Sequence, residues 1–238
     1  MAYSISKVSP GDTRALRQVD ALLEQEGIQR DGNLDYIAAL YDEDYRVIAT
    51  GSCFGNTLRC FAVSHEHQGE GLLNQVITHL IEVQHERGNL QLFLYTKIGS
   101  AKFFGDLGFY EIARVDGTLV FMENRRDGFF RYLKRLEKTR TEGTSAALVM
   151  NANPFTLGHQ YLAETAAAQC DTLHLFIVSE DQSLVPFSVR KELIKAGTAH
   201  LPNVLLHDSG PYIISSATFP SYFLKDEAAV IASCAAGS

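Results

Sequence analysis

A seven-residue turn from Asn153 to His159 carries side chains suited to phosphate chemistry. It joins a strand-like apolar run to an Ala-rich helical run in "ALVMNANPFTLGHQYLAETAAAQC", residues 147–170. A helix N-terminus presents free N–H groups and a positive dipole end, which attract phosphate. Thr156 supplies a hydroxyl donor, Gly158 lets a ligand approach the backbone, and His159 can donate to an oxygen that gains charge. The turn therefore predicts phosphoryl or nucleotidyl transfer by electrostatic stabilisation.

The same turn resembles a family signature. Its residues follow the pattern [Asp/Asn]-Pro-Phe-[His/Thr]-x-Gly-His of the HxGH nucleotidyltransferases, with Thr156 at the first motif position and His159 at the second. The resemblance implies that these two residues are catalytic and grip the phosphates of ATP while its α-phosphate is attacked. The nucleotide-binding residues that we predict are Asn153, Pro154, Phe155, Gly158 and Arg190. For Arg190 and its neighbour Lys191, a solvated helix face remains the alternative.

A glycine loop in "VSHEHQGEGLLNQVITHL", residues 63–80, follows a predicted strand and precedes a predicted helix. Together with "SAKFFGDLGFYEIA" it resembles the GNAT (GCN5-related N-acetyltransferase) fold, which implies that Gln68, Gly69 and Gly71 bind a CoA-like arm. Two positions depart from that family: Glu66 stands where Gln or Arg is common, and Phe104 replaces the tyrosine that serves as general acid. Because phenylalanine cannot give a proton, we do not expect acetyl transfer here. Binding of a pantetheine arm and a structural or docking role both stay open.

Strand and helix patterns divide the chain into two α/β regions. We predict an α+β GNAT-like domain over residues 1–124, a linker helix over 125–143 and a Rossmann-like nucleotidyltransferase domain with a parallel sheet over 144–238. Seven of the 21 basic residues lie in the linker helix. We expect them to form its solvated face, and the alternative is that they face an acidic partner protein. Its apolar stripe, which we expect to dock the helix, consists of Phe129, Phe130, Leu133 and Leu136.

Composition excludes several classes of protein. A formal net charge of −7 argues against nucleic-acid binding. The sequence contains neither a signal-peptide pattern nor an apolar run near the roughly 18 residues that cross a membrane, so we expect no membrane association. His65 and His67 share a loop without a supporting carboxylate or cysteine, so no protein-bound metal is predicted. Reduced thiols and a cytoplasmic location are expected from the unpaired spacing of Cys53, Cys60, Cys170 and Cys234.

The order of the two halves, with "NPFTLGHQYL" and "YIISSATFPSYFLK", resembles the [citrate (pro-3S)-lyase] ligase family. That resemblance implies that ATP, with its Mg²⁺, and acetate form acetyl-AMP and pyrophosphate. The acetyl group then passes to the thiol of the CoA-derived prosthetic group on the acyl-carrier subunit of citrate lyase and activates that enzyme. The carrier subunit and acetate are thus the expected partners.

One expected motif is missing from the sequence. HxGH enzymes carry a second motif, I-S-x-[ST]-x-[IV]-R, but "ISSATFP" at 214–220 has Pro220 in place of the arginine. We therefore expect a chain that is truncated at its C-terminus relative to the family. The alternatives are a cofactor adenylyltransferase, an N-acetyltransferase, which Phe104 disfavours, and a non-catalytic nucleotide- or CoA-binding module.

Overall fold

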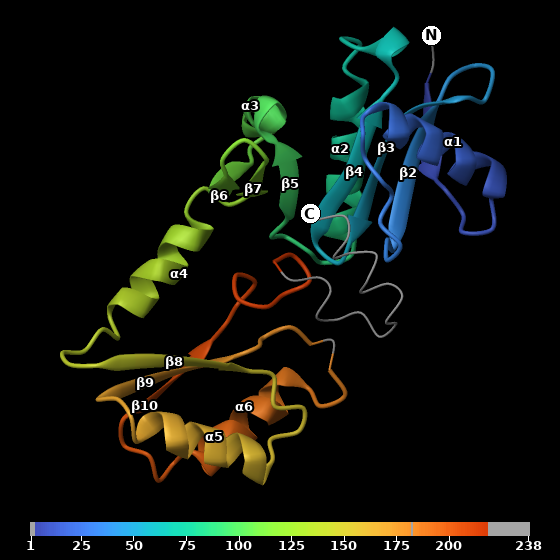
Figure 1. Ribbon diagram of the computed structural model, residues 1–238. Coiled ribbons are helices and arrows are strands. Elements are labelled where there is room, and N and C mark those ends of the chain that lie inside the picture. Colours follow the sequence, from blue (N-terminus) through green and yellow to red (C-terminus); the bar gives the residue numbers. More distant parts are fainter. Residues whose placement is uncertain (1–2, 182, 219–238) are drawn as a thin grey trace. The chain divides into compact units, whose positions relative to one another are not determined.

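The computed structural model describes residues 3–181 and 183–218 (Figure 1). The chain falls into two compact units, which divide between Arg126 and Asp127. Both units combine helices and strands, the first around a mixed sheet and the second around a parallel one. The predicted α+β region followed by a parallel α/β region is thus confirmed.

The N-terminal unit is built on a seven-stranded sheet with the strand order β1-β2-β3-β4-β5-β7-β6. Neighbouring strands are antiparallel except β4 and β5, which are parallel. The strands are β1 (Ser4–Lys7), β2 (Tyr36–Tyr41), β3 (Val47–Phe54), β4 (Thr57–Val63), β5 (Phe93–Lys97), β6 (Tyr110–Val115) and β7 (Leu119–Glu123). The helices are α1 (Thr13–Gln25), α2 (Leu72–Glu86) and α3 (Ala101–Asp106), with 3₁₀ turns at His65–His67 and Ile98–Ser100.

Helices α1 and α2 pack on opposite faces of this sheet because strand β2 alternates. Ala38 and Leu40 join the core that contains α2, and Ala39 joins the core that contains α1. Helix α1 begins after Asp12, whose side chain caps the helix by accepting the N–H of Ala15 at 2.9 Å.

Strands β4 and β5 pair only at Thr57–Phe93 and Leu58–Leu94 and then diverge. Beyond these pairs β4 has a bulge at Cys60, whose φ is 53°. Gly51 of β3 lies against this bulge, and a Cβ there would approach Phe61 and Val76 to within 2.8 Å. Glycine at position 51 therefore lets the bulge and α2 pack closely.

The C-terminal unit is a three-stranded parallel sheet of order β10-β9-β8. Its strands are β8 (Ser145–Met150), β9 (Thr172–Ile177) and β10 (Val204–Asp208), and its helices are α4 (Gly128–Glu137), α5 (Leu157–Ala167) and α6 (Phe187–Gly197). Helices α5 and α6 lie on one face of the sheet (Figure 1). The core between them contains Met150, Leu175, Ile177, Ala163 and Ile194. The strands alternate with helices, so the carboxyl ends of all three strands meet at one edge, where such sheets bind ligands.

Helix α4 corrects one detail of the prediction. The helix uses Phe129, Tyr132 and Leu136 on its buried side, and the rings of Phe129 and Tyr132 lie 5.2 and 5.0 Å from that of Tyr212. Phe130 and Leu133, which were expected in the docked stripe, are 60% and 46% exposed. The expected stripe was therefore wrong at these two positions, because the aromatic ring of Tyr132 takes the central place. Burial raises the pKa of Tyr132 to about 12.

No helix in the described ranges is long and apolar enough to cross a membrane.

Candidate functional site

The predicted phosphate turn leaves the carboxyl end of β8 and enters α5. Ala152 is buried with a φ of 48°, and the peptide bond between Asn153 and Pro154 is cis. Thr156 is the N-cap of α5, and Leu157 is its first residue. The first-turn N–H groups of a helix have no intrahelical acceptor, so this turn presents them at the ligand-binding edge of the sheet. Sequence and structure agree on this strand-turn-helix arrangement.

Thr156 and His159 hold each other in a capping box. The backbone N–H of Thr156 donates to Nδ1 of His159 at 3.1 Å, and the Thr156 hydroxyl lies 2.8 Å from the same nitrogen. Because a backbone N–H can only donate, Nδ1 must be the acceptor, and the proton of the neutral ring is on Nε2. His159 therefore keeps one fixed donor, Nε2–H, for a ligand. Thr156 acts here mainly by fixing this ring.

Two glycines near the turn have different reasons to be glycine. A Cβ at Gly158 would have a single described neighbour, Oγ1 of Thr156, at an ordinary 3.7 Å. A Cβ at Gly197, the last residue of α6, would come within 2.3 Å of the Phe155 ring. Gly197 thus makes room for Phe155, whose ring stacks on His159 at 5.8 Å. The protein itself does not require glycine at position 158.

Arg190 lies beneath the turn and is fully buried, with 0% exposure. Its guanidinium donates to the backbone oxygens of Asn151, Val178, Val185 and Glu180 and to the side-chain oxygen of Asn151, at 2.8–3.0 Å. The described geometry therefore gives this arginine a supporting role: it ties the ends of β8 and β9 together. Neither the predicted phosphate contact nor the alternative of a solvated helix face agrees with this burial.

Two asparagines connect the turn to the segment after β9. Oδ1 of Asn153 accepts the N–H of Val185 at 2.8 Å, and Nδ2 of Asn151 donates to Ser183 at 3.0 Å. Sequence reasoning assigned Asn153 to nucleotide binding and overlooked Asn151. The signal for Asn151 was a polar residue directly after an apolar strand.

Glu180 was also overlooked. Its carboxylate accepts the backbone N–H of Ser216, so it anchors the loop that contains "ISSAT". Ser215 and Thr218 close the loop through the bond from Thr218 N–H to Ser215 Oγ at 3.1 Å. Pro220, on which the missing second motif was argued, lies outside the described residues.

The N-terminal glycine loop precedes α2 as predicted. Gly69 and Gly71 have φ values of 88° and 76°, and nothing lies within 4 Å of a Cβ built at either position. Nε2 of Gln68 lies 3.0 Å from Nδ1 of His65, and Glu70 accepts the hydroxyl of Tyr3. The two positive φ values explain why glycine occurs here. The loop leads into the open N-terminus of α2, which could receive an anionic group.

Phe104 is 3% exposed, and its ring packs on Phe61 at 5.5 Å and on Phe109 at 6.4 Å. This position holds a core residue, and it offers no proton for acetyl transfer.

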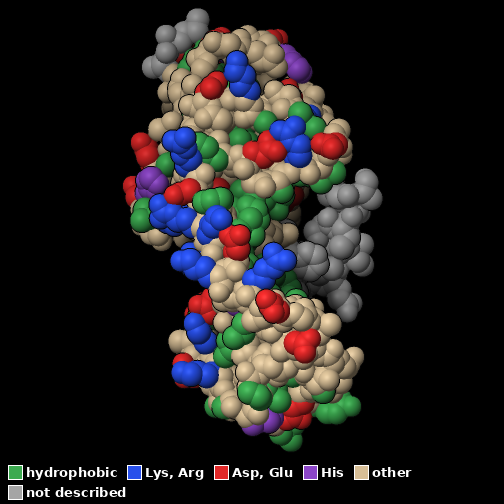
Figure 2. Space-filling view, turned by 90° about the vertical axis from the view of Figure 1, so that its left-hand side faces the viewer, with side chains coloured by type: hydrophobic (Ala, Val, Ile, Leu, Met, Phe, Trp, Pro, Cys, Tyr) green, Lys and Arg blue, Asp and Glu red, His purple; other side chains and the backbone are tan. Residues whose placement is uncertain are grey.

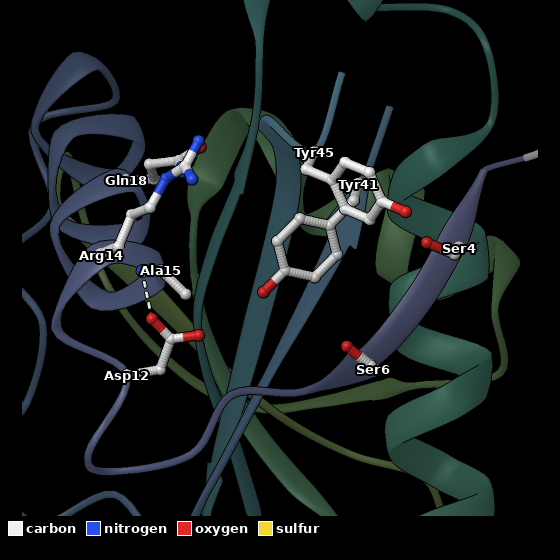
Figure 3. Close-up of a pocket in the computed structure, with 8 residues that line it drawn as sticks. All are labelled: Ser4, Ser6, Asp12, Arg14, Ala15, Gln18, Tyr41 and Tyr45. Atoms are coloured by element: carbon white, nitrogen blue, oxygen red, sulfur yellow. Dashed lines mark hydrogen bonds between the residues drawn. The ribbon is translucent and has the colours of Figure 1, made fainter. Parts of the chain in front are cut away.

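A separate cavity of about 340 Å³ lies between α1 and β1 (Figure 3). Asp12, the N-cap residue of α1, and Arg14 within α1 line it, and Tyr41 and Tyr45 lie close together opposite them (Figure 3). None of the predicted site residues lines this cavity.

His174 of β9 and His207 of β10 form a histidine pair. Nδ1 of His174 lies 2.9 Å from Nε2 of His207, and the two rings stack at 5.1 Å. Burial, and then the neighbouring His174, lower the pKa of His207, while Asp208 raises it. Within the described residues, no group of three or more His, Cys, Asp or Glu side chains is placed to hold a metal ion.

Comparison with known proteins adds family information. Residues 145–236 match the family model described as the citrate lyase ligase C-terminal domain. The chain is 39% identical over 227 residues to the [citrate [pro-3S]-lyase] ligase of Escherichia coli K12, covering 94% of this chain and 64% of that protein. It is 41% identical to the Klebsiella pneumoniae ligase, in an alignment that covers 89% of this chain and 62% of that protein. It is 38% identical to the Haemophilus influenzae ligase, in an alignment that covers 91% of this chain and 65% of that protein. The resemblance to citrate lyase ligases is confirmed, and the chain spans somewhat less than two thirds of the length of these relatives.

Solved structures similar to this chain include acetyltransferases. Escherichia coli ElaA covers 52% of this chain and 99% of its own, at 16% identity and a TM-score of 0.44. The match to an acyl-CoA N-acyltransferase from Pseudomonas aeruginosa covers 52% of this chain and 99% of that protein, at 14% identity and a TM-score of 0.45. TM-scores below 0.5 assign neither an activity nor a ligand to this chain.

Proposed function

We propose that this chain carries the ATP site of a citrate lyase ligase. In this reaction acetate attacks the α-phosphate of ATP, acetyl-AMP forms and pyrophosphate leaves. The thiol of the CoA-derived prosthetic group on the acyl-carrier subunit of citrate lyase then attacks the acetyl carbonyl, so that an acetyl thioester forms and AMP leaves. The 38–41% identity to three ligases of that name supports the assignment of substrates and partner.

The observation that carries this proposal is the single donor left on His159. Nδ1 is occupied by the N–H of Thr156, so only Nε2–H is available, and it stands beside the first-turn N–H groups of α5. Such a set of fixed donors suits an oxygen that gains negative charge when the bond between the α- and β-phosphorus atoms breaks. Gly158 leaves the space next to these donors open for the phosphates.

Acetate needs no general base, because it is already ionised at neutral pH. The protein has to orient the α-phosphate and stabilise the leaving pyrophosphate. Mg²⁺ bound to ATP would add positive charge to the phosphates. Arg190 contributes by holding the carbonyl framework below the turn, at Asn151 and Val178.

For the N-terminal unit we infer a second role, in holding the CoA-like arm of the carrier. The open start of α2 at Gly69 and Gly71 supports this role, as does the divergence of β4 and β5. The buried ring of Phe104 argues against a separate acetyltransferase reaction.

Isotope exchange between pyrophosphate and ATP tests the adenylation step. We expect exchange that requires acetate, and we expect His159→Ala to abolish it. His200→Ala is the matched control, since His200 is an exposed histidine of the same unit that contacts Glu164 at 2.8 Å. Exchange retained in His159→Ala would disprove the site. Exchange that depends on a phosphorylated cofactor precursor would instead indicate an adenylyltransferase, and ATP binding without any exchange a non-catalytic module.

A further inference from the structure

The outer face of α4 has a composition that its packing does not explain. We define this outer face by Phe130, Arg131, Leu133, Lys134 and Lys138, all of them exposed. Residues three and four apart on a helix are neighbours, so Phe130 and Leu133 form an apolar centre among cations. Exposed Lys and Arg side chains are visible in Figure 2 among other residue types.

The opposite face of α4 fixes the helix in place. Tyr132 is 4% exposed, and its ring packs at a tilt against that of Tyr212 in the loop after β10. Ser216, four residues further on, is bound to the Glu180 carboxylate, and the Glu180 backbone oxygen accepts from Arg190. The inner face thus connects α4 to the loops at the carboxyl edge of the sheet. The outer face takes no part in these contacts.

The charge of this segment is opposite to that of the chain. Between residues 125 and 140 there are seven basic and two acidic residues, in a protein with a formal net charge of −7. Two of the cations are locally paired, Arg131 with Asp127 at 2.7 Å and Lys134 with Glu137 at 2.8 Å. Lys134 also lies 5.6 Å from the centre of the Phe130 ring. Lys138 has no ion-pair partner among the described residues.

The basic charge and apolar centre of this face point to the outer face of α4 as the docking surface for the acyl-carrier subunit whose thiol receives the acetyl group, with acidic side chains on the carrier's contacting face as a consequence of the inference. This inference rests on the proposed function. Electrostatic complementarity would steer the carrier toward the helix, and the exposed rings and methyl groups of Phe130 and Leu133 would supply the apolar centre of the contact. Leucine at this centre suits a protein surface better than a nucleic-acid backbone, because phosphates offer no apolar partner for it.

The test measures binding of the purified acyl-carrier subunit to the full chain by isothermal titration calorimetry. One variant combines Lys134→Glu with Lys138→Glu, and a second combines Phe130→Gln with Leu133→Gln. The control combines Lys195→Glu on α6 with Lys102→Glu on α3, two exposed lysines on other helices. We expect Kd to rise about tenfold in both α4 variants and to change less than about twofold in the control. Raising NaCl from 50 to 300 mM should also weaken binding to the unchanged chain.

The outcomes separate docking from catalysis. Acetate-dependent exchange between pyrophosphate and ATP needs no carrier, so it should be the same in the α4 variants and in the unchanged chain. If exchange is retained but the variants bind the carrier normally, the docking surface is disproved and the proposed function stands. Absence of exchange with intact carrier binding would contradict the proposed function alone. Salt-independent carrier binding, or equally tight binding of a poly(U) RNA, would overturn the inference without any variant.

Discussion

Gly158→Ala should separate the stability of the C-terminal unit from its affinity for ATP. The added Cβ would meet only Oγ1 of Thr156, at 3.7 Å, which is an ordinary van der Waals contact. Alanine within a helix is favoured over glycine by about 0.5–1 kcal/mol, because glycine loses more backbone entropy on folding. We therefore expect the variant to be as stable as the unchanged protein or slightly more so. A gain of this size corresponds to a rise in melting temperature of roughly 1–4 °C.

The affinity for ATP should change in the opposite direction. The new methyl group would occupy the space from which a phosphate approaches the first-turn N–H groups of α5 and Nε2–H of His159. Loss of that close approach should weaken binding about tenfold or more, which corresponds to about 1.4 kcal/mol. Differential scanning fluorimetry without ligand and titration calorimetry with ATP and Mg²⁺ measure the two effects separately.

Two further glycine variants control this experiment. The added Cβ of Gly105→Ala in α3 meets nothing within 4 Å, so this variant should leave the affinity for ATP unchanged. Gly197→Ala places a Cβ 2.3 Å from the Phe155 ring and should destabilise the fold by about 1–3 kcal/mol. If Gly158→Ala binds ATP as tightly as the unchanged protein, the phosphates do not lie at this helix N-terminus, and the reasoning from the open glycine is refuted.

Three other predictions follow from buried groups. Arg190→Met should lower the free energy of unfolding by about 3 kcal/mol or more, because it leaves buried carbonyl oxygens without donors. Urea unfolding measures this change, and a decrease below about 1 kcal/mol would contradict the supporting role assigned to Arg190. Burial lowers the pKa of His207 in the folded protein, so the unfolded chain binds protons more readily, and stability should fall as the pH drops below the ordinary histidine value of 6.5 toward the lowered pKa. His207→Gln should flatten this part of the thermal-stability profile, and an unaltered profile would exclude His207 as its source. Burial raises the pKa of Cys60 to about 11, so mass spectrometry should find this thiol unmodified after brief iodoacetamide treatment of the native protein at pH 8.

Much of the fold follows from local signals. The Asp12 cap, the turn between β2 and β3 and the alternation of Ala38, Ala39 and Leu40 are each set by neighbouring residues. The buried side of α4 could not be predicted in this way. Phe129, Phe130, Leu133 and Leu136 fit a helical stripe as well as Phe129, Tyr132 and Leu136 do. The choice depends on Tyr212, which is 80 residues away from Tyr132 in the sequence and packs against its ring.

In the candidate site, too, the features that depend on long-range contacts could not be predicted from local sequence. The placement of Thr156, Gly158 and His159 at the start of a helix after a strand was predictable, because the signals for the turn and the helix start lie within four residues of one another. The role of Arg190 was not, because a basic residue at the start of an amphipathic helix looks solvated or ligand-facing in sequence. Its burial depends on carbonyl groups at Asn151 and Val178, which come together only when β8 and β9 pair.

The structure also explains why threonine can stand at position 156, where the family motif allows histidine or threonine. An N-cap residue must accept an N–H from the first turn, and a hydroxyl does this while it also reaches Nδ1 of His159. An imidazole in place of Thr156 would exchange that short hydroxyl for a larger ring and give up the capping geometry that orients His159. Threonine thus provides one well-fixed histidine donor instead of two separate ones. Under the proposed function, this donor, the helix N-terminus and Mg²⁺ carried in with ATP would together stabilise the charge of the leaving pyrophosphate.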